Sequence, residues 1–282
     1  MQIGPYELHS IETGRFSLDG GAMFGSVPKP LWEKTSPADE RNRIELASRS
    51  LLIVGNGRKI LVDNGCGSKW SPKLADMYKI DTSRFELRRS LALAGVRPEE
   101  ITDVILTHLH FDHAGGSTFV EGGEVKPTFP NARHYVQKAH WEWMLNPTEK
   151  DRASFMADDF MPLHKRGILE FVDGEGELFP CISLLVMNGH TTAQQLPMIT
   201  NGNTVLLFCC DLIPTASHVP LPYIMGYDLR PLTTLADKKR VLGKAWEEQW
   251  ILYFQHDPRI VAARIKATEK GFVWDRESVV KI

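Results

Sequence analysis

The chain has 282 residues, of which 43% are hydrophobic and 24% are charged, so it has the length and composition of a globular protein of one large or two small domains. Its 33 basic and 35 acidic residues give a formal net charge of −2, which argues against a nucleic-acid-binding protein. We recognise no signal peptide and no apolar run as long as a membrane span. The four cysteines form no Cys-x-x-Cys pair, which is typical of reduced thiols and predicts a cytoplasmic protein.

Short strands and helices alternate along the sequence, which predicts a single layered α/β domain over residues 1–282. The first two strands, residues 50–54 and 59–63, flank Gly55-Asn56-Gly57, and this turn sequence predicts a β-hairpin. Apolar runs predict the other strands at residues 103–107, 133–136, 169–172, 182–187, 196–200, 205–210 and 251–254.

Two of the predicted helices have recognisable starts. Ser83 followed by Glu86 is typical of a capping box, and Thr234 with Asp237 forms a similar pair. The helices that we expect span about residues 84–94, 138–145 and 235–249.

Residues 107–116 hold a dense group of metal-ligand side chains, His108, His110, Asp112 and His113. The group follows a predicted strand, where α/β proteins often place functional sites. Imidazole and carboxylate suit zinc, iron or manganese, and a closed structural zinc site would usually include cysteine. On extended backbone His108 and His110 point the same way and can share one metal, whereas Asp112 and His113 can reach a second position. The spacing therefore favours two adjacent metals.

This segment resembles the His-x-His-x-Asp-His signature of the metallo-β-lactamase superfamily. Three further motifs, each at the end of a predicted strand, are similar to later motifs of that family, namely Gly189-His190-Thr191, Cys210-Asp211 and Gln255-His256. Cys210 stands in place of the usual small residue, and Asn64 replaces threonine in a motif that resembles Asp-Thr-Gly. The resemblance spans about residues 45–258 and implies a four-layer αβ/βα sandwich.

The resemblance also implies a set of metal ligands. It places His108, His110 and His190 on one metal ion, Asp112, His113 and His256 on a second, and Asp211 between the two. Zinc is the expected metal, because His110 stands where the di-iron flavoproteins of the superfamily have glutamate, and iron and manganese stay open. Asp63 is expected to orient the histidine loop.

Such a pair of metals implies a hydrolase in which a hydroxide held by both ions attacks a carbonyl carbon or a phosphorus. Asp112 and Asp211 are the expected catalytic residues, with Asp112 passing a proton to the leaving group. The chain resembles the lactonase and organophosphate-hydrolase branch, whose expected substrate is a lactone, ester or phosphotriester. Three alternatives stay open, namely a mononuclear iron persulfide dioxygenase, a glyoxalase-II-like thioesterase and a non-catalytic metal- or ligand-binding module.

Apolar segments near residues 19–32 and 219–227 predict a cleft for a small-molecule substrate. We expect the basic run Lys238–Arg240 to be the solvated face of a helix, and we expect no nucleic-acid or membrane partner. A homodimer stays open. Four histidines outside the motifs, His9, His134, His140 and His164, are expected to be surface or packing residues. The residues expected to line the substrate pocket are Met23, Phe24, Trp32, Phe111, His218 and Tyr223.

Overall fold

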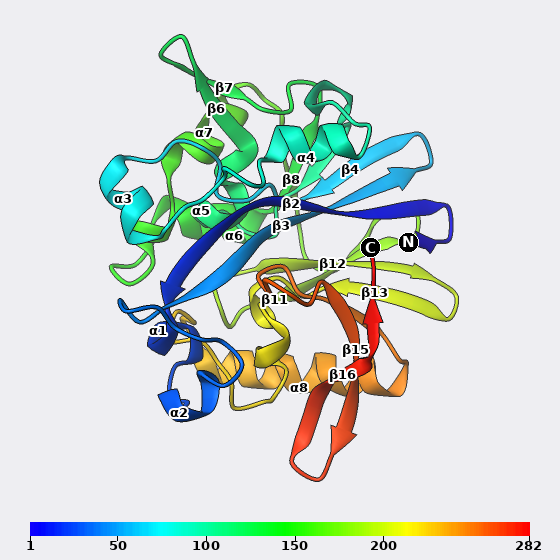
Figure 1. Cartoon of the computed structure of the whole chain (residues 1–282). Helices are drawn as coiled ribbons and strands as arrows, with labels where there is room; N and C mark the ends of the chain where they lie inside the picture. The colour runs from blue at the N-terminus through cyan, green and yellow to red at the C-terminus, as the bar shows by residue number, and fades with distance from the viewer. The chain divides into compact units, whose positions relative to one another are not determined.

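The computed structural model describes residues 1–282, and the chain divides into two compact units. Unit 1 comprises Met1–Phe16 and Ser48–Gly174, and unit 2 comprises Ser17–Ala47 and Glu175–Ile282. The chain forms two seven-stranded sheets and a separate two-stranded sheet (Figure 1). The α/β class is therefore confirmed with two mixed sheets, while the single domain over residues 1–282 stays a prediction.

The first large sheet has the strand order β1-β2-β3-β4-β5-β8-β9. The β3-β4 hairpin turns at Asn56 and Gly57, and both have positive φ (49° and 70°), as a two-residue type I′ turn requires. Strands β4, β5, β8 and β9 run parallel, so their carboxyl ends share one edge of the sheet. The strands predicted in this region are confirmed, with the observed bounds β3 Arg43–Gly55, β4 Arg58–Val62, β5 Asp103–Ile105, β8 Arg133–Gln137 and β9 Leu169–Val172. Two further strands, β1 Gln2–Ile3 and β2 Tyr6–Asp19, were not predicted.

The helices of unit 1 bury a core against this sheet, in which Leu61, Val104 and Val136 pack with Leu91 and Trp141. The α6 helix packs against β8, and α7 packs against the small β6-β7 hairpin. The elements of this layer are α3 Pro72–Met77, α4 Leu87–Leu93, η1 Pro98–Glu100, α5 Phe111–Ala114, η2 Gly115–Ser117, β6 Thr118–Glu121, β7 Glu124–Pro127, α6 Lys138–Leu145, η3 Arg152–Ser154 and α7 Ala157–Lys165.

The predicted capping box at Ser83 is wrong. Glu86 is the N-cap of α4, and its two carboxylate oxygens accept hydrogen bonds from the amides of Arg88 and Arg89, both at 3.0 Å. Ser83 instead donates to Asp81 at 2.6 Å. One glutamate therefore satisfies two of the amides that a helix start leaves without partners.

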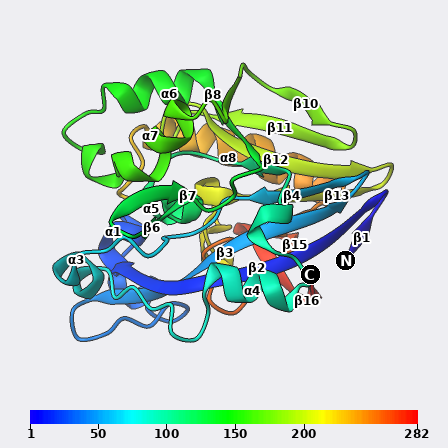
Figure 2. The same ribbon diagram turned by 90° about the horizontal axis from the view of Figure 1, so that it is seen from above.

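The second large sheet follows chain order from β10 to β16. All neighbouring strands are antiparallel except β13 and β14, which run parallel. The crossover that joins β13 to β14 contains the long helix α8, which Figure 2 shows. The predicted strands of this sheet are confirmed, with the bounds β11 Ile182–Met187, β12 Gln194–Asn201, β13 Thr204–Phe208 and β14 Ile251–Tyr253. Three further strands, β10 Gly176–Phe179, β15 Ala262–Thr268 and β16 Gly271–Val280, were not predicted.

Helix α8 (Pro231–Glu247) packs against β15. Its predicted cap at Thr234 is wrong, because α8 begins at Pro231 and Asp237 accepts a hydrogen bond from the amide of Asn188 instead. The remaining short helices of unit 2 are α1 Gly20–Phe24, α2 Lys29–Trp32, η4 Cys210–Leu212 and η5 Ala216–His218. None of the helices combines the length and the apolar character that a membrane crossing demands.

Candidate metal centre

Unit 1 gathers four of the expected ligands after strand β5. His108 and His110 lie in the loop that follows β5, and Asp112 and His113 lie in the first turn of α5. All four side chains are buried. The ligand atoms of His108 and His110 lie within 4.8 Å of each other, as do those of Asp112 and His113. The local motif thus brings its donors together, as its spacing predicts.

Asp63, at the end of β4, binds this histidine loop through both carboxylate oxygens. Its Oδ1 accepts the amide of Thr107 at 2.8 Å, and its Oδ2 accepts the Thr107 hydroxyl at 2.8 Å. The Nδ1 of His113 lies 2.9 Å from the same Oδ2. Because a carboxylate only accepts, His113 holds its proton on Nδ1, and its Nε2 keeps a lone pair that can bind a metal.

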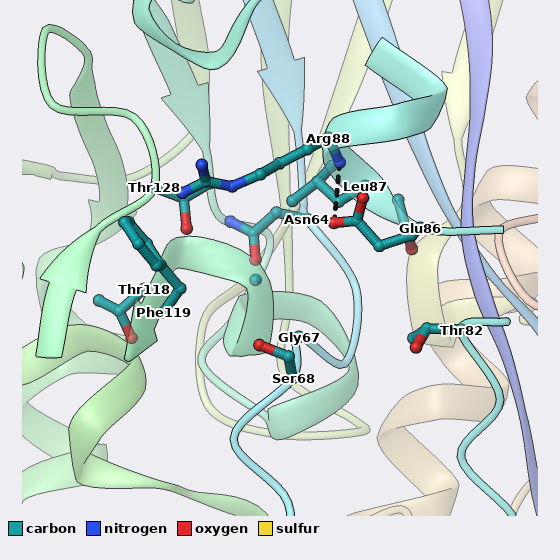
Figure 3. A pocket seen from close by; sticks show the side chains of 12 residues that line it. Asn64, Gly67, Ser68, Thr82, Glu86, Leu87, Arg88, Thr118, Phe119 and Thr128 are labelled. Atoms are coloured by element: carbon teal, nitrogen blue, oxygen red, sulfur yellow. Dashed lines mark hydrogen bonds between the residues drawn. The ribbon is translucent and has the colours of Figure 1, made fainter. Parts of the chain in front are cut away.

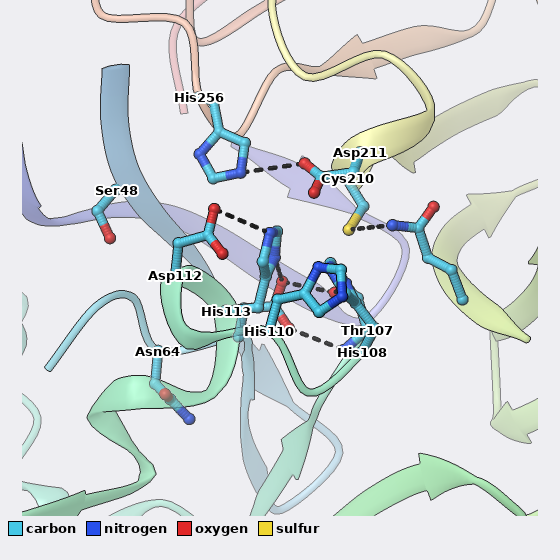
Figure 4. Close-up of polar contacts among 12 residues, drawn as sticks. Ser48, Asn64, Thr107, His108, His110, Asp112, His113, Cys210, Asp211 and His256 are labelled. Atoms are coloured by element: carbon cyan, nitrogen blue, oxygen red, sulfur yellow. Dashed lines mark hydrogen bonds and ion pairs between the residues drawn. The ribbon is translucent and has the colours of Figure 1, made fainter. Parts of the chain in front are cut away.

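The same reasoning fixes the tautomer of His108. Thr107 gives its hydroxyl proton to Asp63, so its oxygen accepts the Nδ1 proton of His108 at 3.1 Å. The Nε2 of His108 then has a lone pair, and it lies 3.0 Å from Nδ1 of His110 (Figure 4). One buried carboxylate therefore orients two histidines, directly for His113 and through Thr107 for His108.

The peptide between the two loop histidines is held by a residue that we expected only to pack. His140, on α6, accepts the amide of Leu109 at its Nε2, at 2.9 Å. Both residues are fully buried. Because the accepting Nε2 carries no proton, neutral His140 has its proton on Nδ1. Its role is to fix the loop peptide between His108 and His110.

Lys69 and the close approach of Gly67 to Gly115 hold the end of the motif in place. The ammonium group of Lys69 donates to the carbonyl of Gly115 at 2.7 Å and pairs with Asp159 at 3.0 Å. Gly67 has φ +64°, and a Cβ there would lie 2.1 Å from the Gly115 oxygen. Only glycine allows this close approach of the two chain segments.

Asn64 lies directly behind the loop. Its amide donates to the carbonyl of His113 at 2.9 Å, and its side-chain nitrogen donates to the Ser117 hydroxyl at 2.8 Å. It also lines a cavity of 60 Å³, together with Arg88 and Phe119 (Figure 3). This cavity is large enough for ordered water to reach the buried amide.

Unit 2 holds the other three expected ligands, His190, Asp211 and His256, and all are buried. The Asp211 carboxylate contacts both imidazoles. Its Oδ2 lies 3.0 Å from Nε2 of His190, and its Oδ1 lies 3.1 Å from Nε2 of His256 (Figure 4). Nδ1 of His256 lies 2.9 Å from the carbonyl of Ala47, which only accepts, so that nitrogen carries the proton. Nε2 of neutral His256 therefore presents a lone pair toward a carboxylate. Either a proton on Nε2 or a metal ion between the two groups would satisfy this arrangement.

Asp228 is a second carboxylate on His190, and sequence reasoning missed it. Its Oδ1 lies 2.9 Å from Nδ1 of His190. Burial lowers the pKa of His190, but the charges and hydrogen bonds of Asp211 and Asp228 outweigh burial and raise it to about 10. Two buried carboxylates on one imidazole show that this position demands positive charge, which a proton or a metal ion can supply.

The backbone around His190 explains the glycine before it. Leu229 and Arg230 donate their amides to the carbonyls of His190 and Gly189, at 3.1 Å and 2.9 Å. A Cβ on Gly189 would lie 2.2 Å from the hydroxyl oxygen of Thr234 in α8. The glycine thus lets the first turns of α8 pack directly against the histidine.

Most of the residues expected to line a substrate pocket are packed together in unit 2. Phe24 stacks on His218, with ring centroids 4.5 Å apart, and on Trp32 at 5.3 Å. Met23, Phe24, Trp32 and His218 are at most 1% exposed. Tyr223 lines a cavity of 330 Å³. The structure therefore shows packing for four of them, and substrate contact stays a prediction for all.

Phe111, the remaining pocket residue, lies in unit 1 between His110 and Asp112. Tyr78 stacks on its ring with centroids 5.0 Å apart, and Trp70 meets it edge-on at 5.2 Å. Burial, followed by the charge of Asp112, raises the pKa of Tyr78. An aromatic cluster thus adjoins the four donors of unit 1.

Comparisons with known proteins identify the family. The model of the metallo-beta-lactamase superfamily matches residues 43–260, so the chain belongs to this superfamily. The predicted family and its α/β fold with two mixed sheets are confirmed. An N-acyl homoserine lactonase of Bacillus thuringiensis is 28% identical over 170 residues, which are 59% of this chain and 60% of that protein's length. The N-acyl homoserine lactonase AttM of Agrobacterium fabrum is 22% identical over 93% of both chains.

Solved structures agree on the fold. The crystal structure of a probable metal-dependent hydrolase from Staphylococcus aureus has a TM-score of 0.87 and 28% identity, over 98% of this chain and 99% of that one. AidC, described as a dizinc quorum-quenching lactonase in complex with a product, has a TM-score of 0.82 and 22% identity, over 100% of this chain and 97% of that one. At this identity AidC supports the fold alone.

Proposed function

We propose that this protein is a metal-dependent lactonase whose seven buried donors hold two divalent metal ions, with zinc as the expected metal. One observation supports this most strongly. In His108, His113 and His256 an acceptor takes the Nδ1 proton, which leaves Nε2 with a lone pair. This common orientation would let all three Nε2 atoms bind a metal.

The donor set fits zinc in chemistry and number. It consists of imidazole nitrogens and carboxylate oxygens, which are ligands that zinc accepts in catalytic sites. We propose that His108, His110 and His190 hold one ion, that Asp112, His113 and His256 hold the other, and that Asp211 bridges them.

When bound, the metal pair would supply Lewis acidity and lower the pKa of water toward neutrality. Asp63 and Asp228 keep the histidines in the ligating tautomer through hydrogen bonds of 2.9 Å each. Asp112 is the proposed proton carrier to the leaving oxygen. The aromatic rings of Trp70, Tyr78 and Phe111 keep the side of the donors that they cover apolar.

The proposed substrate is an N-acyl homoserine lactone. Two observations support it: relatives from Bacillus thuringiensis and Agrobacterium fabrum bear this activity in their names, and an aromatic cluster adjoins the donors of unit 1. A neutral ring with an apolar tail suits such surroundings better than a charged phosphodiester does.

The test combines metal analysis with a substrate panel. We expect about two metal ions per chain and ring opening of N-hexanoyl homoserine lactone by the metal-loaded protein. The panel also contains an aryl ester, a neutral phosphotriester and a glutathione thioester. His113→Ala should lose metal and activity, whereas His9→Ala, at a position outside both donor sets, should keep both. A protein that binds two metals and turns over the thioester or phosphotriester, but no lactone, would contradict the proposal.

A further inference from the structure

Lys238 is fully buried, although the run Lys238–Arg240 predicts a solvated helix face. The buried residues of α8 recur along one side of the helix, and Lys238 is among them, with Thr234 and Leu242 one turn away on either side. Lys239 and Arg240 are exposed, as predicted. Burying an ammonium group costs a large free energy unless its charge and its donors find partners.

The partners of Lys238 are backbone carbonyls of one short segment. Its Nζ donates to the oxygen of His218 at 2.7 Å, of Pro220 at 2.8 Å and of Tyr223 at 2.8 Å. An ammonium group has three donors, so these bonds use all of them. The negative charge of Asp228 acts on Lys238 as a coulombic attraction.

Residues 218–223 have too few backbone amides to pair with all of their carbonyl oxygens. Pro220 and Pro222 have no amide hydrogen, so residues 218–223 contain more backbone acceptors than donors. The amide of Tyr223 already donates to Pro220 at 3.0 Å. Carbonyl oxygens that are buried with no donor are unfavourable, and Lys238 supplies donors that the segment lacks.

We propose that the carbonyl oxygens of His218, Pro220 and Tyr223 form a binding site for a primary alkylammonium ion, which Lys238 occupies from within the chain. Lys238 is thereby a positioning residue for residues 216–223. In the sequence this segment comes after Asp211 and before Asp228, the two residues whose carboxylates contact His190. Within it, His218 also donates to the carbonyl of Met23 at 2.9 Å. The inference does not depend on the proposed lactonase activity.

The test is chemical rescue of a truncated side chain. Lys238→Ala removes three carbons and the nitrogen, which are the heavy atoms of n-propylammonium. We expect the thermal midpoint of Lys238→Ala to fall by about 5 °C or more and to recover saturably as n-propylammonium chloride is added. Burial lowers the pKa of Lys238 to about 7, so measurement at pH 6.5 keeps the wild-type ammonium form populated.

Three controls make the result specific. Tetramethylammonium has the charge but no N–H donor, and 1-propanol has no charge, so neither should restore the midpoint. Lys239→Ala, at the exposed neighbour, should keep its stability and show no response to n-propylammonium. If Lys238→Ala does not fold, Lys238→Met preserves the packing of the side chain and should still be less stable than wild type.

Wild-type stability of Lys238→Met would overturn the inference, because the carbonyls would then need no donor. Equal rescue by tetramethylammonium would also overturn it, since the site would be responding to ionic strength.

Discussion

The hydrogen bond from Leu109 to His140 leads to a sharp prediction about the metal loop. In His140→Leu an apolar side chain of similar size replaces the acceptor, and the amide of Leu109 loses its 2.9 Å partner. Both residues are fully buried, so water does not replace the lost bond. A buried amide with no partner costs about 1–3 kcal/mol.

That cost falls on the peptide between His108 and His110, so we expect it to appear as weaker metal binding. Each 1.4 kcal/mol corresponds to a factor of ten, which gives a loss of roughly 5- to 150-fold in affinity. Mutation of residues that orient metal ligands typically has an effect of about 10- to 100-fold.

The assay is a competition titration of zinc against a chromophoric chelator, with circular dichroism to confirm folding. His140→Gln offers an amide oxygen as an acceptor and should recover part of the affinity. His164→Leu, at an exposed histidine whose ring packs at a tilt against Trp141, should bind zinc as wild type does. Wild-type zinc affinity in a folded His140→Leu variant would show that the Leu109 bond does not position the loop.

Two further predictions concern stability. Burial lowers the pKa of His134 to about 4, from 6.5 in the unfolded chain, so the unfolded state binds the extra proton between these values. The contribution of His134 to stability should be full above pH 6.5 and fall toward pH 4, by about 1.4 kcal/mol per pH unit. The unfolding free energy of His134→Leu, measured by urea at several pH values, should therefore change less with pH over this range than that of wild type. Gly57 and Gly67 have similar positive φ, but only Gly67 approaches another residue, so Gly67→Ala should lower the thermal midpoint well beyond the loss from Gly57→Ala. Equal losses would show that backbone conformation alone sets the cost.

The sequence by itself determined nine of the sixteen strands and the proposed metal donors. These strands were predictable because a strand in a buried sheet appears in the sequence as a short apolar run. The hairpin at Asn56 was predictable because its turn needs positive φ at two positions, which asparagine and glycine readily adopt. The donors were predictable because metal chemistry restricts ligands to few residue types, and the first four lie within six residues. The helix starts were less predictable, because several nearby polar side chains compete for the same free amides, as Glu86 and Ser83 show.

Only the tertiary structure decided which residues hold those donors in place. His140 lies 31 residues from the amide that it accepts, Asp228 lies 38 residues from His190, and Lys238 lies 20 residues from His218. No local pattern links such pairs, because their contacts depend on how separate strands and helices pack. A buried lysine and a solvated one look alike in sequence, since burial is decided by which face of α8 meets the rest of its unit.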